Sequence, residues 1–326
     1  MEITFLSLND SESRDFGNIK VVSSKRHPLV TLTGELQALL KKPKEQFDIV
    51  HSHDLYEIFP WIFAEVKKIY TLHGIVWEER KYTSGFGKVW TRLYEERLRI
   101  CYPKLDKFIA ISQYIIDELK PKGFDTSKAV IIENPISDDF FNIKRNEENL
   151  ILYPATIIPR KNQLGFLRAL SLIKDKIKDF KIIFTGEGSA EYIRILKKYI
   201  EKEKLNVIFL GRISYRKLLE LYSKASIVGL TSFQETLPMA VLESLAVGIP
   251  VIASITGGIP YMIHDYNTGF LVNPTNYREI AEKLLILTSD KKLREKMGKK
   301  GKKEAERRFR AEIIARKLVE LYLDIN

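Results

Sequence analysis

The chain has 326 residues, of which 45% are hydrophobic and 29% are charged, and its formal net charge is +11. This composition excludes a disordered or fibrous protein and supplies enough apolar residues for a sizeable core, over a length that suits two domains better than one. Charges or prolines interrupt every apolar run before the roughly 20 residues that a membrane-spanning helix needs, so the sequence predicts no transmembrane helix.

Short apolar runs alternate with longer segments of helical periodicity, which is typical of α/β folds. In the first half, the predicted strands are EITFLSL, NIKVVSS, FDIVHSH, KIYTLHG, KFIAIS and AVIIENP. The predicted helices are LTGELQALLKK, a segment near YEIFPWIFAEV, residues 86–102 and QYIIDELKPKG. We therefore expect a parallel sheet with covering helices.

The stretch DDFFNIKRNEEN is polar and carries both charge signs, so we place a domain boundary near residues 142–149. Beyond it the alternation restarts with strands ILYPAT, KIIFTG, VIFLG and SIVGLTS, each followed by a helical segment. The tail from Asp290 is helical and basic, and its interspersed glutamates favour a solvated helix face over a lipid or nucleic-acid patch. We predict domains at residues 1–145 and 149–305 and a C-terminal helix at 306–326.

Two glutamates, Glu235 and Glu243, stand eight positions apart in the segment QETLPMAVLESLAVGIPVIAS. Pro238 favours a helix start and Gly248 a stop, which predicts a helix over about 238–247 with Glu243 roughly 8 Å along its axis. A helix N-terminus offers partial positive charge and free N–H groups, so the two carboxylates would bracket a phosphate seat. A nucleoside diphosphate sugar has that layout. The alternative is one carboxylate favoured by the helix dipole and one on the surface.

Other strand ends carry residues suited to phosphate. Arg160 and Lys161 follow ILYPAT at a strand-to-helix corner, where two cations can clamp a pyrophosphate. Gly186 in FTGEGS permits close backbone approach, and FLGRIS holds Arg212. Ligands of open α/β sheets bind at the carboxyl ends of strands, and these residues all fall there.

With these motifs the chain resembles the retaining nucleotide-sugar glycosyltransferases of family four, which have the GT-B fold. The family's E-x7-E signature matches Glu235 to Glu243 and is followed by AVGIPVIA. Further segments that match in order are YTLHG, FIAISQYIIDEL, VIIENPIS, PRKN and GGIPYMIHDYNTGFLVNP. The resemblance implies two Rossmann-like parallel-sheet domains facing each other across a cleft, with the C-terminal helix packing back toward the N-terminal domain.

The resemblance also implies roles for particular residues. Glu243 would hold the nucleotide ribose, Glu235 would hold donor-sugar hydroxyls, and His73 would face the donor sugar from the first domain. Arg160 and Lys161 would neutralise the leaving diphosphate. The remaining residues expected to bind the donor are Thr236, Leu237, Pro238 and Met239 through their backbone, together with Gly186 and Arg212.

The chain departs from the family pattern at several positions. Ala155 and Thr156 stand where a glycine and an arginine are common, so Arg160 would supply the guanidinium. Tyr261 replaces a common glutamate, and Thr236-Leu237 replaces a glycine and a phenylalanine. The usual glycine pair after the first strand is reduced to Gly17, which suggests a more open acceptor side.

The expected reaction transfers a sugar from a nucleoside diphosphate, UDP or GDP, to an acceptor hydroxyl with retention of configuration. Fixed cations and helix N–H groups would stabilise the leaving diphosphate, and the sequence contains no D-x-D motif, so we expect no metal and no cofactor besides the donor. The acceptor would be a glycan, lipid or protein. The single cysteine and the absence of a cleavage site near the N-terminus predict a cytoplasmic protein.

Rival hypotheses remain at this stage. One is a nonenzymatic nucleotide-sugar-binding subunit; a nucleic-acid binder is disfavoured because no module signature appears. Two carboxylates about 8 Å apart would also suit an inverting glycoside hydrolase. A dehydrogenase is weaker, because GEGSAE has only two of the three fingerprint glycines.

Two further features allow two interpretations each. His51 and His53 in HSHD could bind a metal, although a buried strand end is favoured because no third ligand is evident. A segment rich in aromatic and basic residues could form an acceptor site or a contact with the inner face of a membrane, or it could simply pack. Its aromatic residues are Trp77, Tyr82, Phe86, Trp90, Tyr94 and Tyr102.

Overall fold

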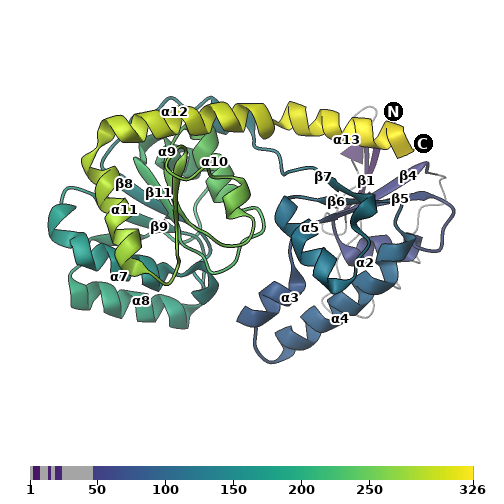
Figure 1. Ribbon diagram of the computed structural model, residues 1–326, viewed down its shortest axis with the longest axis horizontal. Coiled ribbons are helices and arrows are strands. Elements are labelled where there is room, and N and C mark those ends of the chain that lie inside the picture. Colours follow the sequence, from purple (N-terminus) through teal and green to yellow (C-terminus); the bar gives the residue numbers. More distant parts are fainter. Residues whose placement is uncertain (1–2, 8–13, 16–18, 24–46, 326) are drawn as a thin grey trace.

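The computed structural model describes residues 3–7, 14–15, 19–23 and 47–325 (Figure 1). In the first half, every predicted strand is present. The strands are β1 (Ile3–Ser7), β3 (Ile19–Ser23), β4 (Ile49–Ser52), β5 (Lys67–Leu72), β6 (Lys107–Ala110) and β7 (Ala129–Ile131), with β2 (Arg14–Asp15) in addition. The predicted helix LTGELQALLKK and Gly17 lie outside the described residues.

The first domain differs from the prediction in how its strands pair. Strands β4, β5, β6 and β7 form a parallel four-stranded sheet, whereas β1 and β3 pair with each other and with the antiparallel β2. Within the described residues no ladder joins the two sheets, so the single sheet that we expected is divided in two. The helices of this half are α2 (Leu55–Ile58), α3 (Val76–Glu79), α4 (Phe86–Cys101) and α5 (Gln113–Leu119).

The second domain is a six-stranded parallel sheet in the order β10-β9-β8-β11-β12-β13. Its strands are β8 (Leu150–Pro154), β9 (Lys181–Thr185), β10 (Val207–Phe209), β11 (Ile227–Leu230), β12 (Val251–Ser254) and β13 (Gly269–Val272). From β8 the chain moves outward to β10 and then returns to place β11 on the other side of β8. The strand order therefore reverses between β8 and β11, and sheets of this kind bind ligands at the carboxyl ends of the strands where the order reverses.

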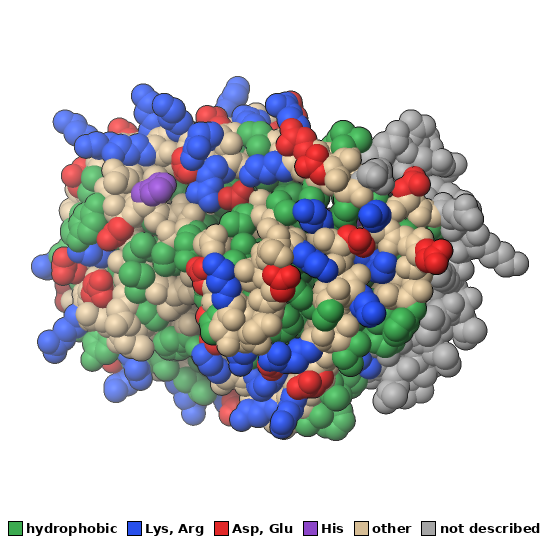
Figure 2. Space-filling view, turned by 45° about the vertical axis from the view of Figure 1, so that its right-hand side comes forward, with side chains coloured by type: hydrophobic (Ala, Val, Ile, Leu, Met, Phe, Trp, Pro, Cys, Tyr) green, Lys and Arg blue, Asp and Glu red, His purple; other side chains and the backbone are tan. Residues whose placement is uncertain are grey.

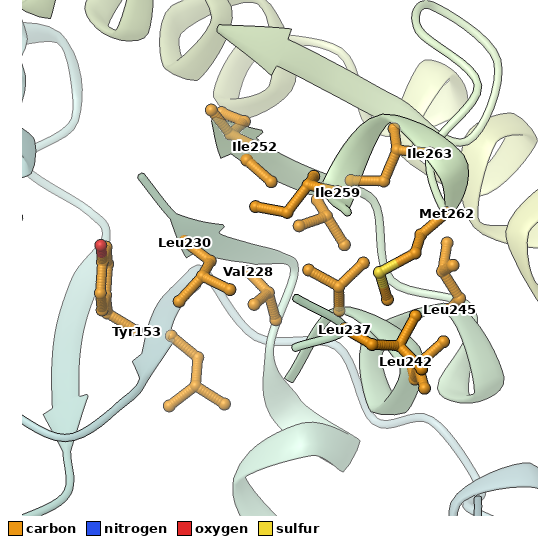
Figure 3. Close-up of a cluster of buried hydrophobic side chains, with 14 of the residues drawn as sticks. Tyr153, Val228, Leu230, Leu237, Leu242, Leu245, Ile252, Ile259, Met262 and Ile263 are labelled. Carbon is orange, nitrogen blue, oxygen red and sulfur yellow. The ribbon is translucent and has the colours of Figure 1, made fainter. Parts of the chain in front are cut away.

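Helices cover both faces of this sheet. They are α7 (Gln163–Ile173), α8 (Ala190–Glu203), α9 (Tyr215–Lys224), α10 (Met239–Val247) and α11 (Tyr277–Ser289). In the core, Val228 and Leu230 of β11 lie near Leu242 and Leu245 of α10, and all four side chains are buried (Figure 3). No helix of the described residues combines the length and the apolar character that crossing a bilayer requires.

The predicted linker is packed more firmly than its polar sequence suggests. Its two phenylalanines are buried in the short helix α6 (Asp138–Phe141). Arg145 donates hydrogen bonds to the carbonyl oxygens of Gly248 and Ala225 at 2.8 and 2.9 Å. Glu147 pairs with the buried Arg294 at 2.7 Å. The linker is therefore fixed to the second domain before β8 begins.

The C-terminal helix returns to the first domain, as predicted. Helix α12 (Lys291–Arg308) runs along the second domain, and α13 (Ala311–Ile325) continues over the four-stranded sheet (Figure 1). Ile314 and Leu321 of α13 pack with Ile69 and Ile109 of the sheet in one buried cluster. Helix α12 extends beyond the predicted start at residue 306, so the final helix begins later than expected.

This packing makes a stability prediction. Leu321→Ala should lower the free energy of unfolding by about 2–3 kcal/mol, because a leucine that is 6% exposed would leave a cavity between α13 and the sheet. Leu323→Ala, on the same helix but 67% exposed, should change it by less than about 0.5 kcal/mol. Urea unfolding followed by tryptophan fluorescence measures this, since all three tryptophans lie in the first domain. Equal effects of the two substitutions would contradict the packing.

Candidate functional site

The reversal of the sheet brings the loops after β8 and β11 together. Tyr153 of β8 is fully buried, and its hydroxyl accepts a hydrogen bond from the Thr231 N–H at 2.9 Å and donates one to the Lys161 carbonyl oxygen. Asn162 caps α7 with its oxygen and donates its amide to the carbonyl oxygens of Thr231 and Pro274, at 2.9 and 2.8 Å. Buried hydrogen bonds from the side chains of Tyr153 and Asn162 to main-chain atoms therefore fix the positions of both loops.

Lys161 and Glu235 meet at this reversal. Nζ of Lys161 lies 2.5 Å from Oε1 of Glu235, and their side chains are only 15% and 7% exposed. The family resemblance implies that the lysine contacts a diphosphate and that the glutamate contacts sugar hydroxyls. The structure joins the two instead, so a ligand that uses either group must share or displace this ion pair. Those ligand contacts stay predictions.

Arg160 forms hydrogen bonds with the residues just before Glu235. Its guanidinium donates to the carbonyl oxygen and the side-chain oxygen of Gln234 at 2.8 and 3.1 Å, and its own carbonyl oxygen accepts the Phe233 N–H at 2.8 Å. Arg160 thus holds the residues that precede Glu235. A direct role on phosphate stays a prediction for this residue.

Two glycines hold the other side of the segment. The Gly258 N–H donates to the Glu235 carbonyl oxygen at 2.9 Å. A Cβ at Gly257 would lie 1.8 Å from the Glu235 carbonyl oxygen, and a Cβ at Gly258 would lie 1.8 Å from that of Thr236. Gly257 also has φ +55, in the left-handed region that favours glycine. Only glycines permit this close approach of the two backbones.

Helix α10 starts one residue later than predicted. Pro238 is the N-cap with φ −68 and ψ 120, an extended conformation, and its carbonyl oxygen accepts hydrogen bonds from Val241 and Leu242. The Leu237 side chain is buried in the core, so a ligand could meet only its backbone (Figure 3). Met239 is 38% exposed. The N–H groups that precede Val241 have no carbonyl oxygen one turn earlier in the helix to donate to. A phosphate seat at the start of α10 stays a prediction.

Glu243 points in a different direction from Glu235. Its Oε2 accepts a hydrogen bond of 2.7 Å from the hydroxyl of Tyr222 on α9, which is fully buried. Burial raises the pKa of Glu243, although the Tyr222 hydrogen bond opposes this. Our sequence reasoning missed Tyr222. Tyr222 follows Leu221 on the buried face of a segment with helical periodicity, and this position could have indicated it.

Gly186 and Arg212 lie at the same edge of the sheet. Gly186 has φ +110, and a Cβ there would lie 2.4 Å from the Ala155 carbonyl oxygen. Its N–H donates to the Gly211 carbonyl oxygen at 2.8 Å, and the next residue, Arg212, is exposed. Gly186 therefore allows the loops after β8, β9 and β10 to pack side by side, with Arg212 free to reach a ligand.

The carboxyl edge of the first domain's sheet contacts the segment around Glu235. Ser112, after β6, donates a buried hydrogen bond of 3.2 Å to the Thr236 carbonyl oxygen. Tyr82 stacks on Phe233 with 6.4 Å between ring centroids and an interplanar angle of 9°. The hydroxyl of Tyr261, the residue that replaces a common glutamate, donates to Asp117 at 2.6 Å. The departure at Tyr261 thus forms a bridge between the domains.

His73 lies at the carboxyl edge of the first domain's sheet. It follows β5, whose Leu72 pairs with Ala110 of β6, so it lies one strand away from Ser112. Its Nε2 lies 2.8 Å from Nδ1 of His53, and the two rings are stacked. Burial lowers the pKa of both imidazoles, and the charge of His53 lowers the pKa of His73 further. A neutral pair, with one nitrogen donating and the other accepting, fits this contact.

His51 lies beside this pair, with its ring centroid 4.7 Å from that of His53, but its ring nitrogens contact other residues. Its ring nitrogens lie 2.6 Å from the Tyr322 hydroxyl on α13 and 2.7 Å from the Thr71 hydroxyl. Burial and the neighbouring histidines lower the pKa of His51 to about 3, so the ring is neutral. Over the described part of the chain, no group of three or more His, Cys, Asp or Glu residues could hold a metal. The buried-strand-end interpretation of HSHD fits His51.

Two known protein families together match nearly the whole chain. The family described as "Glycosyl transferases group 1" matches residues 136–304, and "Glycosyltransferase Family 4" matches residues 2–140. The chain belongs to the group 1, family 4 type of glycosyltransferases.

Individual relatives are distant. An uncharacterized glycosyltransferase of Methanocaldococcus jannaschii is 27% identical over 60% of this chain, and the chain spans 54% of that relative's length. The Escherichia coli UDP-Gal:alpha-D-GlcNAc-diphosphoundecaprenol alpha-1,3-galactosyltransferase is 28% identical over 79% of this chain and 70% of its own length. Anabaena Alr3699/HepE, solved with UDP and glucose, superimposes with a TM-score of 0.75 over 93% of this chain and 85% of its own, at 18% identity. The fold is GT-B.

The glycine contact makes a testable prediction. Gly257→Ala should lower the free energy of unfolding of the second domain by more than about 2 kcal/mol, because its Cβ would meet the Glu235 carbonyl oxygen at 1.8 Å. Gly211→Ala is the matched control: φ is +64, but no atom lies within 4 Å of its Cβ. Its cost should be about 1 kcal/mol. Thermal unfolding followed by far-UV circular dichroism measures both, and equal costs would contradict the close approach.

Proposed function

We propose that this protein is a retaining, metal-independent glycosyltransferase that moves a sugar from a nucleoside diphosphate, UDP or GDP, to an acceptor hydroxyl. The observation that carries this proposal is the Lys161–Glu235 contact at the sheet reversal, beside the start of α10. A cation and helix N–H groups there suit a diphosphate, and a carboxylate suits sugar hydroxyls. The name of the E. coli relative contains UDP-Gal and the HepE structure holds UDP and glucose, and both support this proposal.

Different residues would contact different parts of the donor. Lys161 and the first N–H groups of α10 would contact the diphosphate, while Glu235 would accept hydrogen bonds from the sugar. Glu243, whose carboxylate already accepts one hydroxyl from Tyr222, would accept a ribose hydroxyl in addition. His73, held by His53 at the facing edge, would contact the sugar from the first domain.

In the proposed reaction the bond between the anomeric carbon and the diphosphate oxygen breaks. A bond from the acceptor oxygen to the anomeric carbon forms on the same face, and the acceptor proton passes to the leaving phosphate. The main obstacle is the negative charge that develops on the leaving diphosphate. The ammonium of Lys161 and the preorganised N–H groups of α10 would stabilise this charge and so lower the activation barrier. We assign no protein nucleophile and no general base.

The acceptor would be a glycan, a lipid or a protein, and the compartment would be the cytoplasm. The E. coli relative is named for an acceptor sugar on diphosphoundecaprenol, which favours a lipid-linked glycan among these classes. A glycoside hydrolase is disfavoured, because Glu235 faces Lys161 and Glu243 faces Tyr222 instead of one shared bond. A nonenzymatic donor-binding subunit would bind the nucleotide sugar without turnover.

Incubation with UDP-, GDP- and ADP-sugars tests this function. Thermal shifts identify the donor, and release of nucleoside diphosphate that depends on added acceptor detects transfer. Proton NMR of the product reports whether the anomeric configuration is retained, and the same assay with EDTA tests independence from metal. Donor binding without any diphosphate release would favour the nonenzymatic subunit.

Glu235→Gln should reduce transfer about 100-fold, which corresponds to about 2.7 kcal/mol of transition-state stabilisation, because the amide is neutral and leaves Lys161 unpaired. Binding of UDP alone, measured by calorimetry, should change much less than transfer. Glu220→Gln, at an exposed glutamate of α9, serves as the control and should leave both unchanged. Transfer by the Glu235 variant at a near wild-type rate would refute the assigned role.

A further inference from the structure

Helix α4 has an apolar face turned toward solvent as well as one turned toward the core. Leu98 and Cys101 are fully buried under the helix. On its outer side four apolar residues are exposed: Phe86 by 75%, Val89 by 53%, Leu93 by 46% and Ile100 by 57%. At about 100° per residue these four positions fall within an arc of roughly 60°, along roughly 21 Å of the helix. We call these four residues the α4 stripe.

A surface helix normally turns its polar side to water, so the α4 stripe needs an explanation. Three of the segment's aromatic residues do not contribute to the α4 stripe. Trp77, Tyr94 and Tyr102 are engaged inside the domain through hydrogen bonds to Glu118, Tyr70 and the Asp125 carbonyl oxygen, respectively. The packing interpretation therefore applies to these three aromatics, whereas Phe86 is exposed and belongs to the α4 stripe with three aliphatic residues.

Cations line one side of the α4 stripe. Lys88, Arg92 and Arg99 fall on a neighbouring arc of the helix, about 110° from the stripe, with Glu96 between. Lys88 and Arg92 are exposed, and their side chains make no ion pair with any described residue. Figure 2 shows Lys and Arg side chains beside hydrophobic ones along the lower edge of the molecule, on the side where Figure 1 places α4.

A surface hollow of about 460 Å³ adjoins the α4 stripe. The residues that line it are Arg80, Lys88, Val89, Arg92, Glu95, Glu96 and Lys122. Glu95 is already paired with Arg80 at 2.6 Å, so Lys88, Arg92 and Lys122 leave the hollow positively charged despite Glu96. An anionic headgroup would fit beside the apolar side chains.

We propose that the α4 stripe and its flanking cations bind the surface of an anionic lipid bilayer. The four apolar side chains would enter the boundary between headgroups and acyl chains, while Lys88 and Arg92 would contact lipid phosphates. A second copy of the chain fits less well, because two α4 faces would bring the same cations together. This inference goes beyond the proposed glycosyl transfer and does not depend on it. The first domain would meet the membrane on the side opposite α13 (Figure 1).

Flotation of the full-length chain with vesicles tests the apolar part. Binding is expected to vesicles of phosphatidylcholine and phosphatidylglycerol at about two to one, and not to phosphatidylcholine alone. Val89→Asp with Leu93→Asp should weaken binding at least tenfold, about 1.4 kcal/mol. Leu172→Asp with Ile195→Asp is the matched control: these residues are 53% and 45% exposed on the second domain, and binding should persist. Circular dichroism verifies that each variant is folded.

A second pair of variants tests the charges. Lys88→Glu with Arg92→Glu should also weaken binding at least tenfold, whereas Lys197→Glu with Lys198→Glu, at two exposed lysines of α8, gives the same net charge and should not. No binding to anionic vesicles would overturn the proposal, and so would equal losses in test and control variants. A dimer that Val89→Asp with Leu93→Asp dissolves, without any vesicle binding, would identify a second copy as the occupant instead.

Discussion

The position of β11 beside β8 is the constraint on which the site depends. Because the chain reverses there, the loop that holds Lys161 and the loop that holds Glu235 leave adjacent strands in the same direction. Their contact would otherwise require bringing together residues 74 positions apart on a surface loop. Tyr153 and Asn162 connect both loops to the sheet through buried hydrogen bonds. These hydrogen bonds, together with the attraction between the two charges, keep Lys161 and Glu235 in contact. A buried pair costs desolvation, which an arriving diphosphate and sugar could offset.

The segment from Phe233 to Met239 is held on three sides. Arg160 binds it from the loop after β8, Gly257 and Gly258 approach its backbone from the loop after β12, and Ser112 reaches it from the first domain. Such support preorganises N–H groups and a carboxylate without relying on side-chain entropy. The burial of Leu237 also explains how this residue can differ from the family pattern, because its side chain lies in the core and is not presented to a ligand.

Much of the fold could be predicted from the sequence because period-two and period-3.6 patterns are local. Strands β4 to β11 and the start of α10 are predicted within a few residues, whereas β12 and β13 are not predicted, and the E-x7-E motif locates Glu235 and Glu243. Contacts between distant segments were not predictable in this way. Nothing local indicates that Lys161 pairs with Glu235, that Tyr222 binds Glu243, or that His53 contacts His73. The outward stripe of α4 was also hidden, because periodicity gives the faces of a helix but not which face the core covers.

The central claim is that the Lys161–Glu235 pair beside α10 forms the seat for a nucleoside diphosphate. A crystal structure of the protein with bound UDP tests this most directly. The account predicts phosphate oxygens within about 3.5 Å of the Lys161 Nζ and of the first N–H groups of α10. It also predicts the ribose beside Glu243 and Tyr222. UDP bound elsewhere, with Lys161 still paired only with Glu235 and the start of α10 empty, would contradict it.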